Sequence, residues 1–137
     1  MAEPKIIATA TAEIGETRYA TSIRTGNHAL TADEPKPEGS DAGASPFGLV
    51  LSGLGACTAI TLRMYAERKE WPLKSVHVDL AFHWEMVGEE RRPHIERTLR
   101  LEGPLDDAQR ARIAEIAEKT PVTRALKSGI AIRTVLS

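Results

Sequence analysis

The chain has 137 residues, of which 18 are basic and 19 acidic, for a formal net charge of −1. This length fits one domain over residues 1–137 with its own core, and the balanced charge argues against nucleic acid or an anionic membrane surface as a partner. The N-terminus lacks the apolar core of a signal peptide and no apolar run approaches the length of a membrane span, so we expect a cytoplasmic protein with no membrane segment.

Metal and cofactor chemistry finds little support in the sequence. The single cysteine, Cys57, excludes an internal disulfide framework and a multi-thiolate zinc site within one chain. Among the four histidines, only His77 and His83 share a strand face, which is more often solvated than ligating. Sequence motifs for phosphate loops, nucleophilic serines and zinc helices are absent. We therefore expect no metal and no cofactor.

The first third of the chain predicts an antiparallel meander of three strands. Lys5–Ile14 and Thr17–Arg24 are separated near a glycine, and the second alternates with a period of two. A turn at Gly26 and Asn27 leads to a short strand, His28–Ala32. Residues 33–45, rich in proline, glycine and aspartate, are too near the N-terminus to link two domains, and we expect an ordered loop; a plain connector is an equally good alternative.

A long helix over Ser45–Lys69 organises the rest of the chain. Ser45 is suited to cap it and Pro46 to its first position. Its interior is rich in glycine and other small residues, which predicts a central, buried helix that other elements approach closely. Its apolar positions recur at spacings of three and four, which places the cysteine on an apolar stripe: Val50, Leu54, Cys57, Thr61 and Met64.

The second half predicts a long hairpin followed by two helices and a strand. Lys74–Val87 alternates cleanly and pairs with His94–Glu102 across a charged connection. Leu105–Lys119 is an amphipathic helix, Val122–Lys127 a short one and Gly129–Leu136 a final strand. The predicted order is βββ-α-ββ-α-α-β, an α+β fold with antiparallel sheets wrapped around the long helix.

The chemistry of Cys57 depends on whether its thiolate forms. A buried cysteine is more often a small hydrophobe than a nucleophile, and Cys57 lies beyond the helix turn where the dipole acts strongly. A nearby cation would have to stabilise the thiolate. Arg18, Arg24 and Arg124 are the candidates, whereas Arg63 is more consistent with a solvated position. Spacing leaves these alternatives open.

Together these segments resemble the OsmC/Ohr family over nearly the whole chain, nearer its OsmC-like branch. The matching residues lie in the loop, the long helix and the region of the two later helices: Asp33, Glu34, Pro35, Gly39, Asp41, Gly43, Ser45, Pro46, Leu54–Ala59, Thr61, Leu62, Tyr65, Ala66, Gly103, Leu105, Arg110, Ile116, Ala117, Pro121 and Val122.

The resemblance implies an intertwined homodimer with an OsmC-like fold and active sites at the subunit interface. It also implies a thiol peroxidase without metal or prosthetic group, in which a first cysteine is oxidised by peroxide and a second closes a disulfide. Cys57 matches the first cysteine. The family's activating arginine corresponds to Arg24 as a first choice and Arg18 as a second.

Two departures from the family pattern bear on this expectation. Thr120 stands where the second cysteine would be, and Gly48 where a glutamate would hold the arginine. The sequence therefore predicts a hydroperoxide reductase in oxidative-stress defence that works through Cys57 alone and an external thiol or dithiol reductant. The alternative is a non-catalytic member that binds a small apolar ligand or a partner at the dimer interface.

Overall fold

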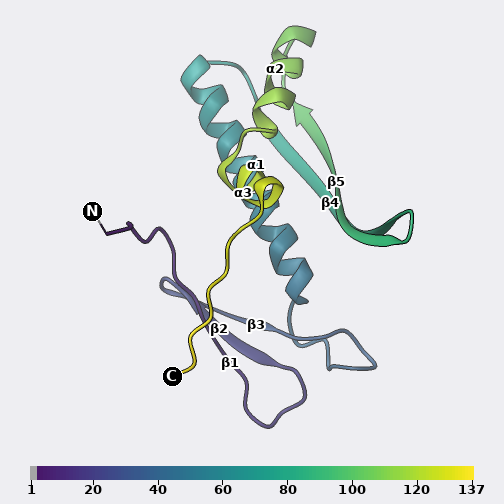
Figure 1. The fold of residues 1–137 in the computed structure, drawn as a ribbon. Helices are drawn as coiled ribbons and strands as arrows, with labels where there is room; N and C mark the ends of the chain where they lie inside the picture. The colour runs from purple at the N-terminus through teal and green to yellow at the C-terminus, as the bar shows by residue number, and fades with distance from the viewer. Residues whose placement is uncertain (1–2) are drawn as a thin grey trace. The chain divides into compact units, whose positions relative to one another are not determined.

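The fold of residues 3–137 is described by a computed structural model (Figure 1). It is an α+β structure with antiparallel sheets and one long helix, as predicted. The elements follow in the order β1 (Thr11–Glu13), β2 (Thr21–Thr25), β3 (His28–Ala32), α1 (Pro46–Lys69), β4 (Ser75–Val87), β5 (Glu90–Glu102), α2 (Asp107–Ala117) and α3 (Pro121–Ser128). Two compact units divide after Val50, within α1, and each is taken by itself below. A single domain over 1–137 stays a prediction.

The first unit contains the three-stranded sheet β1-β2-β3. β3 has its predicted bounds, and the turn between β2 and β3 uses Gly26 at φ +57°. The prediction of one long strand over Lys5–Ile14 is wrong, because only Thr11–Glu13 pairs with β2. Thr17–Arg24 was also misplaced. Tyr19 has φ +79°, which interrupts an extended chain, so β2 begins only at Thr21.

A loop built around one buried carboxylate connects β3 to α1. Asp33 is 2 % exposed, and its side chain accepts hydrogen bonds from the backbone amides of Glu34, Ser40 and Ala42 at 2.7, 3.3 and 3.0 Å. The loop is therefore ordered, as predicted. At its end Ser45 Oγ accepts from the Gly48 amide at 3.1 Å, which confirms the predicted cap of α1.

The buried face of α1 is not the predicted stripe. Leu54, Thr58, Leu62 and Ala66 are buried, at spacings of four. Val50 and Met64 are 44 % and 56 % exposed, so the predicted stripe lies partly in the open. The helix comes close to β4 at Gly55, where an added methyl group would lie 2.9 Å from Leu80 Cδ1.

The second unit is dominated by the hairpin of β4 and β5. The alternation predicted for Lys74–Val87 is confirmed from Val76 to Phe82, where every second side chain is half-buried, while Trp84 and Met86 near the tip are 44 % and 63 % exposed. β5 begins at Glu90 rather than at His94. The charged residues expected in the connection are paired in the strand instead, and the turn is confined to Gly88 and Glu89.

The core of the second unit joins α1, α2 and the base of the hairpin. Its buried centre is Leu62, Ile113 and Ala117, with Trp71, Val76, Leu99, Leu101, Leu105 and Ile116 packed against it. Asp106 and Gln109 form a reciprocal capping box at the start of α2. Both helices differ from their predicted ranges by two residues or fewer at each end.

The predicted final strand, Gly129–Leu136, is wrong for the single chain. These residues have no regular secondary structure, and Ile130, Ile132 and Leu136 are 62, 87 and 97 % exposed. An alternating sequence forms a strand only when a neighbouring strand supplies hydrogen-bond partners. In the described chain, residues 129–137 pair with no strand.

α1 is the one helix of residues 3–137 that is long and apolar enough to cross a membrane: it has 24 residues, and a stretch of 18 residues within it has a mean hydropathy of 1.5. The sequence had suggested no such segment. Length and composition alone are weak evidence, because the core helix of a soluble protein meets the same criterion.

Candidate functional site

The single cysteine lies in the first half of α1, at the edge of its buried face. Cys57 is a free thiol and is half-buried. Its neighbour Thr58 is fully buried and points to the inner side of the helix, where its hydroxyl donates to the Leu54 carbonyl at 2.7 Å. Cys57 is therefore held on a rigid turn while its own side chain remains partly accessible.

An arginine from β5 reaches this same turn. Arg97 Nη1 donates to Thr58 Oγ1 at 3.0 Å and to Thr123 Oγ1 on α3 at 2.9 Å. Arg97 Nη2 donates to the Ala117 carbonyl and to Glu118 Oε2, both at 3.1 Å. One guanidinium, 11 % exposed, thus connects α1, β5, the end of α2 and α3.

Arg97 forms an ion pair with Glu118, which also pairs with Lys127 at the surface. Glu118 bonds both Arg97 and Lys127. The hydrogen bond from Lys127, followed by that from Arg97, lowers the pKa of the Glu118 carboxyl below its ordinary value, against an opposing effect of desolvation. Two cations and one anion leave this cluster with a net positive charge.

Thr120 and Thr123 form the start of α3, and Thr123 is the residue there that contacts Arg97. Thr120 is fully buried and caps α3, and its hydroxyl lies 2.6 Å from that of Thr123. Thr123 Oγ1 also donates to the Ala117 carbonyl at 3.3 Å. The resemblance places a second cysteine at position 120, where the hydroxyl of Thr120 is instead hydrogen-bonded within α3.

The arginines singled out from the sequence occupy different environments. Arg18 stacks on the Tyr19 ring, with its guanidinium carbon 5.5 Å from the centroid, and Arg24 is exposed on β2. Both lie in the first unit and Cys57 in the second, so their roles toward the cysteine stay predictions. Arg124 is exposed on α3.

Arg63 was expected to be solvated, and this was wrong. Its guanidinium donates to the Leu73 and Lys74 carbonyls at 2.6 and 3.1 Å, which holds the end of α1 to the start of β4.

Sequence reasoning missed Arg97, although a signal was present. Ile95, Leu99 and Leu101 lie on the inner face of β5, and a period of two puts Arg97 on that face between them. A charge at an apolar position of an amphipathic strand requires a buried partner.

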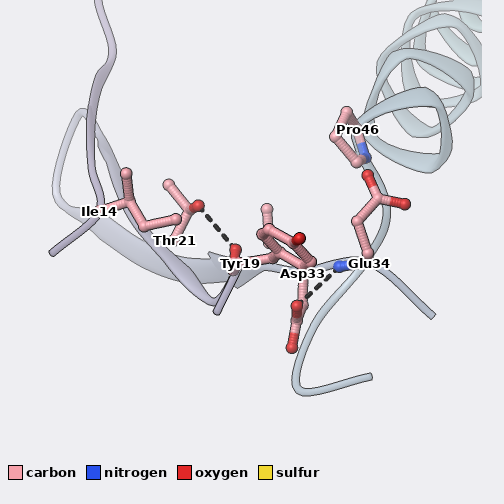
Figure 2. A pocket seen from close by; sticks show the side chains of 7 residues that line it. Ile14, Tyr19, Thr21, Asp33, Glu34 and Pro46 are labelled. Carbon is pink, nitrogen blue, oxygen red and sulfur yellow. Dashed lines mark hydrogen bonds between the residues drawn. The ribbon is translucent and has the colours of Figure 1, made fainter. Parts of the chain in front are cut away.

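A hollow of about 230 Å³ lies in the first unit, next to the loop. Figure 2 shows Tyr19 and Thr21 along it, Asp33 bonded to the Glu34 amide, and Glu34 close to Pro46. Ile14 and Ala32 complete its lining, which is mainly apolar. Because the Asp33 carboxylate is occupied by backbone amides, Glu34 is the carboxylate left at this hollow.

Among residues 3–137, no group of three or more His, Cys, Asp or Glu side chains has the arrangement of a metal site. In the second unit, Cys57 is a free thiol, and the next residue of the helix, Thr58, accepts a hydrogen bond from Arg97.

Comparison with solved structures identifies the class of fold. An OsmC-like protein from Mycoplasma pneumoniae aligns with a TM-score of 0.76 and 18 % identity, covering 90 % of this chain and 89 % of that one. An organic hydroperoxide resistance protein OsmC from Legionella pneumophila gives 0.69 and 19 %, covering 91 % and 92 %. One from Elizabethkingia anophelis gives 0.71 and 18 %, covering 92 % and 91 %. These likenesses define an OsmC-like fold.

The family follows from the sequence itself. The model of the OsmC-like protein family matches residues 39–135, which include α1, the hairpin and both later helices. A comparison with curated protein sequences gave no match. The chain belongs to the OsmC-like protein family, as the resemblance had implied.

Proposed function

We propose that the protein is a hydroperoxide reductase that uses Cys57 as its only redox thiol and an external thiol as reductant. The observation that carries this proposal is the position of Cys57, a half-buried free thiol on the long helix of a chain in this family. The names of similar structures that refer to organic hydroperoxide resistance support a role in oxidative-stress defence. A free cysteine also suits the reducing cytoplasm.

The reaction would proceed in three balanced steps. The Cys57 thiolate attacks one peroxide oxygen, the O–O bond breaks, and the alkoxide leaves as an alcohol after taking a proton. The sulfur retains the other oxygen as a sulfenic acid. An external thiol then attacks that sulfur, releases water and forms a mixed disulfide. A second thiol attacks the reductant's sulfur in this mixed disulfide, so that Cys57 leaves as a thiol and the reductant leaves as a disulfide. Thr120 cannot replace this external thiol, since a hydroxyl forms no disulfide.

The proposed assembly is a homodimer. In this dimer Arg24, or alternatively Arg18, would lie near Cys57. Support comes from α1, whose Ile60 and Met64 are 58 % and 56 % exposed in the single chain. Apolar side chains that alternate with small residues along a helix allow close approach of a second copy.

The test is to mix the reduced protein with cumene hydroperoxide and titrate the free thiol. We expect one thiol per chain to disappear within minutes at equimolar peroxide and to return after addition of a dithiol. Cys57→Ser should consume no peroxide, whereas Ala56→Ser, a matched change on the exposed neighbouring position, should react like the parent. A thiol that stays reduced throughout would contradict the proposal.

The second candidate is a non-catalytic protein that binds a small apolar ligand. The hollow between Tyr19, Thr21 and Pro46 favours it, although its volume is below the range of about 300 to 1,000 Å³ typical of ligand sites. Tyrosine fluorescence titrated with small apolar compounds would detect binding in the parent, and Thr21→Trp should abolish it by filling the hollow. Peroxide-independent function retained in Cys57→Ser would favour this candidate.

A further inference from the structure

Two histidines lie opposite each other on the outer face of the β4–β5 hairpin. His83 on β4 is the direct register partner of His94 on β5, and their ring centroids are 4.8 Å apart. Directly opposed residues of antiparallel strands project to the same face of the sheet. From the sequence, His77 and His83 are the histidines that share a strand face, but six residues along a strand separate them by about 20 Å. The structure instead pairs His83 with a histidine of the neighbouring strand.

Two carboxylates lie against this pair. Glu85 Oε2 is 3.4 Å from His94 Nδ1, and Glu96 Oε1 is 3.2 Å from His94 Nε2. Arg92 is the register partner of Glu85, but its guanidinium pairs with Glu90 at 2.7 Å. Neutral histidines beside these carboxylates leave the surroundings of the pair with a net negative charge, which favours a bound cation.

The separation of the two rings suits one metal ion shared between them. Zinc binds a histidine nitrogen at about 2.0–2.1 Å with tetrahedral angles, so two imidazoles on one ion have ring centres about 5 Å apart. The 4.8 Å between His83 and His94 agrees with this separation. A ligating histidine commonly donates its other ring N–H to a carboxylate. Glu85 and Glu96 place such an acceptor at either nitrogen of His94.

We propose that His83 and His94 bind one divalent transition-metal ion of the zinc, nickel or copper class, with Glu85 and Glu96 orienting His94. Imidazole favours these ions over magnesium and calcium, which prefer oxygen ligands. Water completes the coordination, so the ion exchanges with solution. A bound ion joins β4 to β5 near the hairpin tip and stabilises the folded chain by mass action. The site is separate from the chemistry proposed for Cys57.

Isothermal titration calorimetry with zinc chloride tests the site, at a pH above about 7, where ordinary histidines are neutral. Every protein in this test carries Cys57→Ser, because a free thiolate also binds zinc. We expect one ion per chain in this background. His83→Gln and His94→Gln should each weaken binding by about tenfold or more, because each removes one of two ligands.

His77→Gln is the matched control, since His77 is an exposed histidine on the same face of β4 and lies away from the pair. It should leave the zinc affinity within about twofold of the Cys57→Ser protein. Glu85→Gln should weaken binding less than either substitution in the pair, because its carboxylate acts through His94. Magnesium chloride should give no saturable binding at the concentrations used for zinc.

Nuclear magnetic resonance of the imidazole nitrogens identifies the ligands without a histidine variant, so it decides the matter if a variant does not fold. Zinc should shift the ring nitrogen signals of His83 and His94 and leave those of His28 and His77 unchanged. The absence of zinc binding, unchanged affinity in both His83→Gln and His94→Gln, or equal shifts of all four histidines would overturn the proposal.

Discussion

At the scale of single residues, buried polar side chains decide where the chain is rigid. Asp33 organises the loop before α1 through three backbone amides, and Arg97 organises the later unit through four acceptors. Each is a charge on the inner side of the structure with its hydrogen bonds satisfied, so removal of either one leaves buried partners unpaired.

Asp33 makes stability depend on pH in the acid range. The Ala42 amide, the largest contributor, and the amides of Glu34 and Ser40 lower the pKa of Asp33, while desolvation opposes them. A lowered pKa in the folded state contributes stability that is full above the unfolded-state value of about 4 and is lost as the pH falls through the folded value. Asp33→Asn should reduce stability at pH 7 and flatten this acid dependence.

Thermal melts of Asp33→Asn and the parent between pH 2 and pH 7 would test this pH dependence. Asp41→Asn is the control, because Asp41 is an exposed loop residue at φ +54°, which asparagine tolerates. Equal acid dependence in Asp33→Asn and the parent would contradict the role of Asp33.

Thr58 illustrates the cost of an unpaired donor. Thr58→Val preserves the shape of the side chain but leaves Arg97 without one acceptor, so we expect a loss of about 1–3 kcal/mol in unfolding free energy. Urea titration measures it. Thr61→Val, on the half-buried side of the same helix, should change stability by less than about 0.5 kcal/mol.

At the scale of elements, helix starts follow local rules that the sequence displays. The Asp106 carboxylate accepts from the Gln109 amide at 2.7 Å and the Gln109 side chain accepts from the Asp106 amide at 2.9 Å. Asp106→Ala should cost about 1 kcal/mol of stability. Asp107→Ala, next in the chain, removes only an interaction with the helix dipole and should cost less. Equal losses in urea titrations would argue against the capping box.

The glycines of α1 provide a second matched pair. A methyl group at Gly53 meets nothing within 4 Å, whereas one at Gly55 lies 2.9 Å from Leu80 Cδ1. Gly53→Ala should therefore raise stability by up to about 1 kcal/mol through helix propensity. Gly55→Ala should gain less or lose stability, because the Leu80 side chain has to move. A larger gain at Gly55 than at Gly53, measured on the same monomer or dimer, would contradict this packing.

These elements also separate what sequence predicts from what it does not. The start of α1, the whole of β3 and the inner face of β4 follow from neighbouring residues, through the Ser45 cap, the Gly26 turn and a period of two. The buried face of α1 shifted by one residue because Leu80 and Arg97, distant in sequence, determine which side is covered. Cys57 was identified by its local motif, but Arg97 was missed because its partners Thr58, Thr123 and Glu118 come from three other segments.

At the scale of the whole molecule, the single chain leaves apolar surface on α1. We expect a homodimer, and Ile60→Asp should shift it toward monomer because a carboxylate would be buried against the second copy. Light scattering at micromolar concentration measures the mass. Glu67→Lys, an exposed charge change on the same helix, should keep the parent mass. A monomeric parent would remove the basis for active sites shared between subunits.

Proteolysis of the exposed segment from Gly129 to Leu136 would measure assembly. Arg133 lies between Ile132, which is 87 % exposed, and the Val135 side chain at 72 %, so trypsin has open access to it in the isolated chain. If the alternating residues of this segment gain a strand partner on assembly, the same bond becomes protected. The rate of cleavage at Arg133 should then fall as the protein concentration rises. This decrease would report the assembled fraction and requires no assay with peroxide.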